Sequence, residues 1–181
     1  MRNRVRHWVE LDARWTRELT IADRPGPLRD VARFLAHSGD SWFWIAGALI
    51  VGVVGNDAWK YRALVMGLAI ILTAAIVLAL KFLIHRPRPV GEWGGIYRKT
   101  DPHSFPSGHA ARALLLSVLG LGLGPVWFAG LLLVWGPLVA VARVAMGVHY
   151  LFDILAGALL GAFLGWVWLQ ILPPLLQSIL I

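Results

Sequence analysis

The sequence lacks cysteine entirely and is poor in charged residues. The absence of cysteine excludes disulfide bonds and thiol catalysis, although it indicates no particular compartment. Only 15% of the 181 residues are charged, and 58% are hydrophobic. Soluble domains are usually about a quarter charged and about half apolar. This balance counts against a soluble protein and makes the distribution of the apolar residues informative.

Three long stretches, residues 63–80, 113–142 and 154–181, contain no charged side chain. Uncharged apolar stretches of about 18 residues or more are typical of membrane-spanning helices. A shorter apolar stretch at 41–55 begins with Ser-Trp-Phe-Trp, and such aromatic residues are enriched at the headgroup boundary. The sequence therefore predicts an all-α, multi-pass transmembrane helical bundle.

Turn residues divide the apolar stretches into about five spans, with six as the alternative. The expected spans cover about residues 41–56, 62–85, 107–122, 125–146 and 149 to 173 or beyond. Five spans place the polar loop at 86–106 and the junction of the last two spans on one membrane face. The N-terminus would share that face, and the C-terminus would lie on the other.

Residues 1–40 are expected to form an amphipathic segment in front of a membrane domain at 41–181. Hydrophobic residues recur at helical spacing with arginines between them, without the apolar core or cleavage site of a signal peptide. The Pro25-Gly26-Pro27 sequence divides the segment into two short helices. The first helix suits the membrane interface. Packing against its own membrane domain is an equal alternative.

Three ionisable residues lie among apolar neighbours, where charges are costly and usually mark function. His149 and Asp153 are four residues apart, so on one helix they share a face, and the carboxylate can orient the imidazole. Arg143 lies six residues before His149 and would face elsewhere on a continuous helix. A helix break at Gly147 would bring all three together, and the functional interpretation depends on that break.

The stretch HSFPSGHAAR at residues 103–112 predicts a helix that starts at an anion site. Pro106 and Ser107 suit a helix start, where backbone N–H groups and the positive dipole end favour an anion. Gly108 permits close approach of the backbone, and Ser107 can donate its hydroxyl. His109 would face the same anion and can protonate a departing oxygen. Ser107 or His109 alone would also fit an ordinary N-cap or an interface histidine.

Lys81 and Arg88 add positive charge from the other side of the polar loop, although Lys81 alone would suit a snorkelling anchor. Together with Arg143 they place three cations and a helix N-terminus around His149. This arrangement suits a multiply charged, tetrahedral oxyanion such as a phosphoryl group. His149 can attack phosphorus and form a covalent phosphohistidine.

A metal site is the competing interpretation, because several potential ligands occur in the same region. No HExxH or paired-carboxylate pattern is present, and the cations would repel a divalent metal, so neither a metal nor another cofactor is expected. The side chains considered as ligands are Asp101, His103, His109, His149 and Asp153.

The residues singled out above match three signatures of a known family. KFLIHRPRP at 81–89 fits K-x6-R-P, FPSGH at 105–109 contains P-S-G-H, and ARVAMGVHYLFD at 142–153 fits R-x5-H-x3-D. The chain therefore resembles the type 2 phosphatidic acid phosphatase (PAP2) superfamily of integral membrane lipid phosphatases. Each signature is weak alone, whereas all three in this order at membrane edges are specific.

The resemblance implies roles for the matching positions. His149 would be the nucleophile, Asp153 would orient it, and His109 would protonate the lipid leaving group without any metal. Two departures from the family are an alanine at 142, where a serine is usual, and five spans instead of the six of many bacterial members. The residues implied to hold the phosphoryl oxygens are Lys81, Arg88, Ser107, Gly108 and Arg143.

The residues and the resemblance together predict a metal-independent lipid phosphatase. Candidate substrates are phosphatidic acid, phosphatidylglycerol phosphate, and diacylglycerol or polyprenyl pyrophosphates. A polyprenyl pyrophosphate is slightly preferred, because a short chain without a soluble domain suits bacterial envelope metabolism. The alternative is a non-catalytic phospholipid-binding or transport protein, although a His–Asp pair beside a second histidine has little use in binding. The membrane spans count against a third interpretation, a haloperoxidase-like vanadate site.

The expected partners are a membrane lipid phosphate and the lipid bilayer. Nucleic acid is not expected, since no basic stripe interleaved with aromatic residues occurs outside the N-terminal segment. The expected location is the bacterial cell (inner) membrane, with the site on the extracytoplasmic face, as in bacterial relatives that act on envelope lipids. Residues 1–40 carry 8 basic against 6 acidic groups, a surplus too small to fix the orientation.

Overall fold

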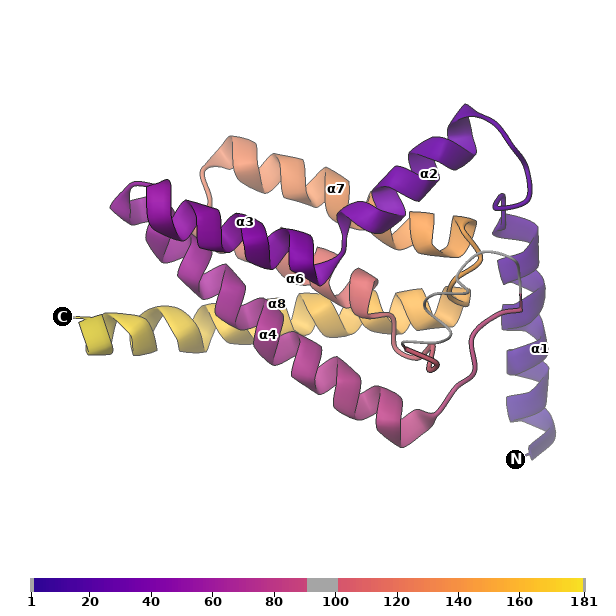
Figure 1. Ribbon diagram of the computed structural model, residues 1–181. Helices are drawn as coiled ribbons and strands as arrows, with labels where there is room; N and C mark the ends of the chain where they lie inside the picture. Colours follow the sequence, from indigo (N-terminus) through magenta and orange to yellow (C-terminus); the bar gives the residue numbers. More distant parts are fainter. Residues whose placement is uncertain (1, 91–100, 181) are drawn as a thin grey trace.

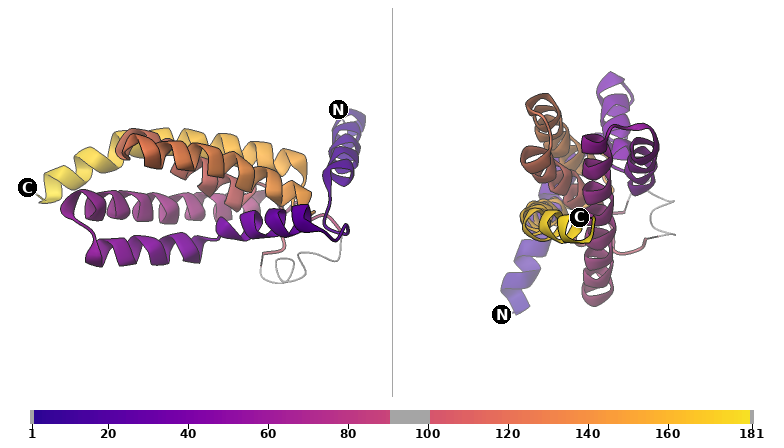
Figure 2. Two further views of the ribbon diagram at one scale, coloured as in Figure 1. Left: turned by 90° about the horizontal axis from the view of Figure 1, so that it is seen from above. Right: turned by 90° about the vertical axis from the view of Figure 1, so that its left-hand side faces the viewer.

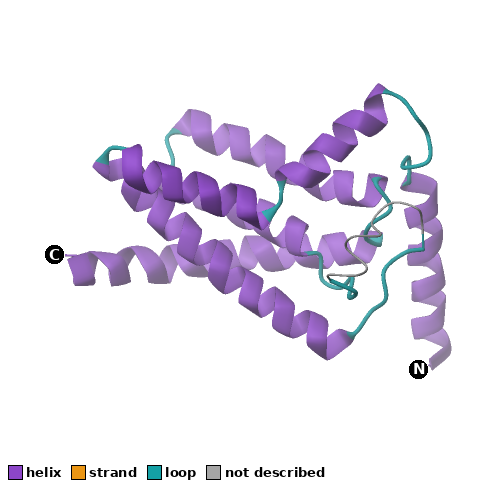
Figure 3. Ribbon diagram, viewed as in Figure 1, coloured by secondary structure: helices purple, strands orange, loops and turns teal. Residues whose placement is uncertain are grey.

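The computed structural model describes residues 2–90 and 101–180, and all of its regular structure is helical (Figure 3). No strand occurs among these residues, which confirms the prediction of an all-α fold. The helices are labelled as in Figure 1.

Two helices precede the apolar part of the chain. α1 (Arg2–Leu19) is followed by a turn and by α2 (Pro27–Ser38), whose first turn contains Pro27 as expected. Gly26 before it has a φ of +152°, a conformation that residues with a side chain rarely adopt. The Pro-Gly-Pro sequence therefore separates two helices, as predicted.

Five apolar helices follow in the described part, which agrees with the expected number of spans. α4, α7 and α8 are long and apolar enough to cross a membrane, whereas α3 and α6 are shorter. α4 begins at Asp57 rather than near 62, because the Asn56 side chain accepts a hydrogen bond from Trp59 N at 3.0 Å and caps it. The helices are α3 (Ser41–Val54), α4 (Asp57–Ile84), α6 (Gly108–Leu123), α7 (Val126–Ala145) and α8 (Leu151–Leu180).

The five apolar helices run roughly along one direction, and α1 lies across one end of the bundle (Figure 2). The loops at 85–90 and 101–107 and the α7–α8 turn gather at that end (Figure 3), and the C-terminus lies at the opposite end (Figure 1). The polar segments therefore share one end of the molecule, as the spacing of the spans predicts.

α6 is the central helix of the bundle. Its Leu115, Leu116 and Leu119 are fully buried and form one core cluster with Ile70 of α4 and Leu132 of α7. Such burial on several sides explains why α6 shows no polar face along most of its length. The core thereby fixes the position of the N-terminus of α6, where the P-S-G-H signature lies.

Three glycines bring α8 close to α6. Gly157, Gly161 and Gly165 lie four residues apart, so they form a stripe of small residues on one face of α8. A Cβ atom at Gly157 would collide with the carbonyl oxygen of Ser107, and one at Gly161 with that of Ala111. This close contact places the first turn of α6 beside the first turns of α8.

α1 packs against α7 and α8 with a polar face turned inward. Asp12 is fully buried and Thr16 nearly so, whereas Trp8, Val9 and Leu19 are about half exposed. Of the two sequence-based alternatives, packing against the membrane domain is therefore present. The apolar side chains that face outward remain available to the membrane interface.

Candidate active site

The structure brings the eight predicted site residues together at the α1 end of the bundle. They come from the end of α4, the following loop, the start of α6, the end of α7 and the start of α8. Gly108 and His109 are partly exposed. The buried members are Lys81, Arg88, Ser107, Arg143, His149 and Asp153.

The helix break on which the functional interpretation depends occurs where the sequence predicts it. α7 ends at Ala145, and Gly147 has a φ of +63°, in the left-handed region that favours glycine. α8 begins at Leu151, so His149 lies in the connecting turn rather than on the first helical turn. The reversal brings His149 back beside the last turn of α7, which carries Arg143.

His149 lies between Asp153 and Arg88. Its Nδ1 is 3.6 Å from Asp153 Oδ2, and its Nε2 is 3.0 Å from an Arg88 guanidinium nitrogen. Because arginine can only donate, Nε2 must accept, and the ring proton of the neutral imidazole then lies on Nδ1, facing the carboxylate. The Nδ1–Oδ2 distance exceeds that of a hydrogen bond, a contact that commonly tightens when substrate binds.

Burial, Arg88 and Arg143 each disfavour a positive charge on the imidazole. Together they lower the pKa of His149 well below its ordinary value of 6.5. The imidazole is therefore neutral at physiological pH, and Nε2 keeps the lone pair that a nucleophile needs.

Asp101 binds two of the predicted phosphate-binding cations. Its Oδ2 lies 2.8 Å from an Arg88 guanidinium nitrogen and also pairs with the Lys81 ammonium. Arg88 is further held by the backbone oxygens of Asp101 and Val148, at 2.7 and 2.9 Å. One carboxylate oxygen thus lies between two cations.

α6 starts where the sequence predicts a helix start. Ser107 is its N-cap, and the serine Oγ accepts from Ala110 N at 3.4 Å. Ser107 N in turn donates to the backbone oxygen of Asp153 at 3.0 Å, which ties this helix start to α8. His109 follows in the first turn, and its Nε2 lies 2.6 Å from Asp40 Oδ1.

Arg143 is 1% exposed and is held from α2, since one guanidinium nitrogen donates to Ala36 O at 3.3 Å. α2 therefore contributes to the site through its backbone. Within the described residues, no three His, Asp or Glu side chains converge as a metal site requires.

Four further residues contact the site, and the sequence does not predict these contacts. In the sequence Asp101 is only a candidate metal ligand, and Arg86 occupies one of the unspecified positions inside the first signature. Asp40 and Asp12 lie in the N-terminal segment, far from the signatures in sequence. In the sequence, Asp12 and Asp40 differ from other acidic residues only in lying in the interfacial helix and at a turn. That position does not indicate which residues they contact.

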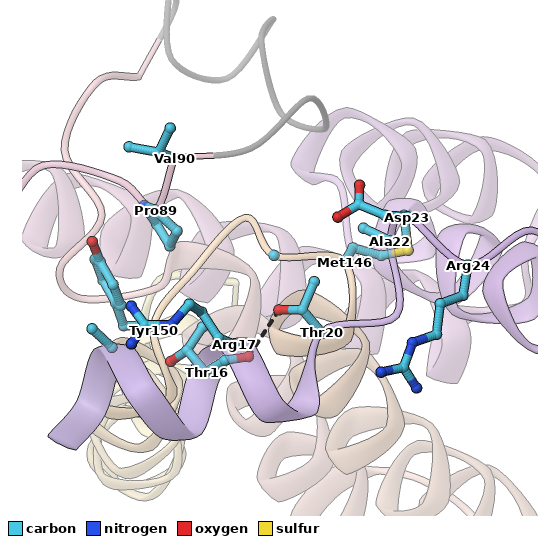
Figure 4. Close-up of a pocket in the computed structure, with 12 residues that line it drawn as sticks. Thr16, Arg17, Thr20, Ala22, Asp23, Arg24, Pro89, Val90, Met146 and Tyr150 are labelled. Carbon is cyan, nitrogen blue, oxygen red and sulfur yellow. Dashed lines mark hydrogen bonds between the residues drawn. The ribbon is translucent and has the colours of Figure 1, made fainter. Parts of the chain in front are cut away.

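A pocket of about 570 Å³ joins the site to the apolar surface of the bundle. Lys81, Gly108 and His109 line its polar end, and Trp42 and Val77 belong to its apolar wall. A second pocket of about 570 Å³ lies between α1, the loop at 89–90 and the α7–α8 turn (Figure 4). None of the eight site residues lines this second pocket.

Comparison with known sequences identifies the family. The PAP2 superfamily matches residues 62–176. Decaprenylphosphoryl-5-phosphoribose phosphatase of Mycobacterium tuberculosis is 33% identical over 147 residues, which cover 80% of each chain. Undecaprenyl-diphosphatase of Sulfolobus acidocaldarius is 28% identical and covers 76% of this chain and 68% of that protein.

Solved structures agree with the fold. A transmembrane PAP2-type phosphatidylglycerolphosphate phosphatase from Bacillus subtilis matches with a TM-score of 0.71 and 25% identity, over 90% of this chain and 84% of that one. Aquifex aeolicus LpxE matches with a TM-score of 0.66 and 24% identity, over 83% of this chain and 90% of that one. All three signatures lie within the residues that match the family. The chain therefore belongs to the PAP2 superfamily.

Proposed function

We propose that this chain, a phosphatase of the PAP2 type, removes the terminal phosphate from a polyprenyl phosphate or diphosphate in the membrane, through a phosphohistidine on His149. The observation that carries this proposal is the first pocket. Its polar end is formed by Lys81, Gly108 and His109, and its apolar wall is formed by helices that face lipid. A phosphate headgroup fits the first part and a hydrocarbon chain fits the second.

Phosphate binding replaces contacts that the site already makes. The phosphoryl oxygens take the place of Asp101 Oδ2 on Lys81 and Arg88, and further oxygens bind Arg143 and the N–H groups that open α6. Backbone oxygens hold Arg88 and Arg143 before the substrate arrives. Little reorganisation is then needed to stabilise the charge that develops on the phosphoryl oxygens during transfer.

In the first step, His149 Nε2 attacks phosphorus, the phosphorus–nitrogen bond forms, and the bond to the lipid oxygen breaks. The imidazole ring becomes positively charged when phosphorylated, and Asp153 stabilises the Nδ1–H on the other side of the ring. Arg88 releases Nε2 as it turns its donors to the phosphate. The lone pair of His149 is thereby directed at phosphorus.

His109 protonates the departing lipid oxygen. A carboxylate only accepts hydrogen bonds, so His109 Nε2 carries the proton that faces Asp40 Oδ1. Nδ1 is then the atom that transfers a proton to the leaving oxygen, and the Asp40 charge stabilises the protonated ring before transfer.

In the second step, His109 Nδ1 accepts a proton from water, the hydroxide oxygen attacks phosphorus, and the phosphorus–nitrogen bond to His149 breaks. Inorganic phosphate leaves, and both histidines return to their starting states.

The relatives support a polyprenyl substrate. The name of the 33% identical M. tuberculosis protein specifies decaprenylphosphoryl-5-phosphoribose, and that of the 28% identical S. acidocaldarius protein specifies undecaprenyl diphosphate. Both compounds carry a polyprenyl chain. The site residues contact only the terminal phosphate, so monophosphate and diphosphate forms are both compatible with them. The phosphate-release assay described next decides between a monophosphate and a diphosphate.

The test is phosphate release by purified protein in detergent with excess EDTA. The panel comprises polyprenyl monophosphate and diphosphate, phosphatidic acid and phosphatidylglycerol phosphate, with His149→Ala as the control. We expect release from a polyprenyl substrate by the wild type and none by the variant. Release from none of these lipids would favour the binding or transport alternative. A preference for phosphatidic acid would overturn the substrate assignment.

We further propose that the protein lies in the bacterial inner membrane with the site on the extracytoplasmic face. The absence of cysteine permits a direct test. Arg24→Cys introduces one thiol in the pocket beside the α7–α8 turn (Figure 4), and Gln177→Cys introduces one near the C-terminal end of α8, which lies at the opposite end of the bundle. A membrane-impermeant maleimide added to intact cells should label Arg24→Cys and leave Gln177→Cys unlabelled. The reverse pattern would place the site in the cytoplasm.

A further inference from the structure

The first turn of α8, which carries Asp153, is capped mainly by side chains of α1. Tyr150 N donates to Asp153 Oδ2 at 2.9 Å, a contact within the turn itself. Leu151 N donates to Thr16 Oγ1 at 3.0 Å, and Phe152 N donates to Asp12 Oδ1 at 3.0 Å. Helix N-termini need such acceptors for their free N–H groups. Two of these three therefore come from a helix more than 130 residues earlier in the chain.

The second oxygen of Asp12 reaches the catalytic carboxylate through Arg86. One guanidinium nitrogen of Arg86 lies 2.6 Å from Asp12 Oδ2, and another lies 2.7 Å from Asp153 Oδ1. Both carboxylates are fully buried. The Tyr150 ring packs against the guanidinium at 4.1 Å. Arg86 thus bridges two buried acids and balances part of their charge.

This bridge determines how the oxygens of Asp153 are used. Because Arg86 is shared with Asp12, it contacts only Oδ1 of Asp153. Oδ2 is left to accept from Tyr150 N and to face His149 Nδ1. Without the Asp12 charge, Arg86 would be free to engage both oxygens of Asp153, since arginine favours bidentate pairing with carboxylates. Oδ2 would then be drawn away from the imidazole.

We propose that Asp12 is a positioning residue of the active site, which acts through Arg86 to keep Asp153 Oδ2 directed at the nucleophile His149. α1 is accordingly part of the site and not only a membrane-facing helix. This inference rests on the proposed function of His149. It adds a residue that lies outside the three family signatures and outside residues 62–176, which the family matches.

The purely structural explanation is that Asp12 serves only to attach α1. Asp12→Asn separates the two roles, because the amide oxygen still accepts from Phe152 N while the charge that holds Arg86 is lost. Thr16→Val is the matched control, since it removes the neighbouring cap at Leu151 without touching Arg86. A role confined to attachment predicts similar losses of thermal stability and activity in both variants.

The experiment measures kcat, KM and thermal unfolding of the full chain in detergent. We expect Asp12→Asn to lower kcat by about tenfold, with KM within about twofold of wild type. Thr16→Val should lower kcat by less than about threefold. Equal effects of the two substitutions on kcat, or a change in KM alone, would overturn the proposal.

A double-mutant cycle tests the path through Arg86. If Asp12 acts through Arg86, Asp12→Asn added to Arg86→Gln should lower kcat no further than Arg86→Gln alone. Additive losses would show that Asp12 acts by another route. Failure of both single variants to fold would make the cluster structural and would also overturn the proposal. The proposed function is tested separately, by comparing turnover of the wild type with that of His149→Ala, which should be inactive.

Discussion

His109 Nε2 lies 2.6 Å from Asp40 Oδ1, so a carboxylate outside the family signatures is paired with the residue that we propose as the proton donor to the leaving group. The second oxygen of Asp40 lies 3.5 Å from His37 Nδ1. Asp40 lies at the junction of α2 and α3 and precedes the first span. The N-terminal segment therefore reaches the leaving-group side of the site as well as the nucleophile side.

Asp40→Asn should selectively slow the cleavage of substrates whose leaving group needs a proton. The asparagine oxygen still accepts from His109, but its lack of charge no longer stabilises the protonated ring. We expect kcat for a polyprenyl phosphate to fall by about tenfold to a hundredfold. An alkyl-substituted nitrophenyl phosphate, which leaves without protonation, should be affected far less. Equal losses with both substrates would contradict the pairing.

The imidazole of His149 should titrate well below pH 6.5 in the folded protein, because burial, Arg88 and Arg143 lower its pKa. Ring-¹⁵N histidine NMR in detergent measures this pKa, and His149→Ala identifies the signal. At pH values between the lowered pKa of folded His149 and 6.5, this histidine is protonated in the unfolded chain but not in the folded protein. The free energy of unfolding therefore decreases, through His149, as the pH falls from 6.5 to the pKa of the folded protein. An ordinary midpoint for the His149 signal would contradict the proposed environment.

Asp101→Asn should strengthen the binding of a phosphate analogue. The Asp101 carboxylate pairs with Lys81 and Arg88 and therefore competes with phosphoryl oxygens for the same cations. We expect the inhibition constant of vanadate to fall by about fivefold, which corresponds to about 1 kcal/mol. Asp57→Asn, the same change at the exposed opposite end of α4, should leave it unchanged. Weaker inhibition in Asp101→Asn would show that Asp101 organises the cations instead.

Gly161→Ala should destabilise the bundle, because the added Cβ collides with the backbone of α6 at Ala111. We expect the free energy of unfolding to fall by about 1–3 kcal/mol, as in other overpacked cores. Gly130→Ala on α7 is the control, since a Cβ there meets no atom within 4 Å. It should be neutral or slightly stabilising. Similar melting temperatures of the two variants in detergent would contradict the close contact between α6 and α8.

The sequence predicts most of the fold and the grouping of the eight candidate site residues, because both depend on local signals. Long uncharged stretches identify spans, and the spacing of Arg143, His149 and Asp153 requires a break that Gly147 allows. The structure confirms that break. The repeat of glycines at 157, 161 and 165 indicates a close helix contact, but it does not identify α6 as the partner.

The contacts of Asp12, Asp40 and Asp101 were not predictable in this way. Each carboxylate contacts residues of another element, 13 to more than 100 positions away in the sequence. Spacing within one helix carries no information about such pairs. Their roles become apparent only when α1 and the α2–α3 junction are placed against the end of the bundle.

The most direct test of the account is to trap the phosphorylated enzyme. Wild-type protein is mixed with a polyprenyl phosphate or diphosphate carrying ³²P in its terminal phosphate, in excess EDTA, and quenched with alkali during turnover. We expect label on His149 that is stable in alkali, lost in acid and absent from His149→Ala. Turnover by the wild type without label on His149, or a variant that retains full activity, would contradict it.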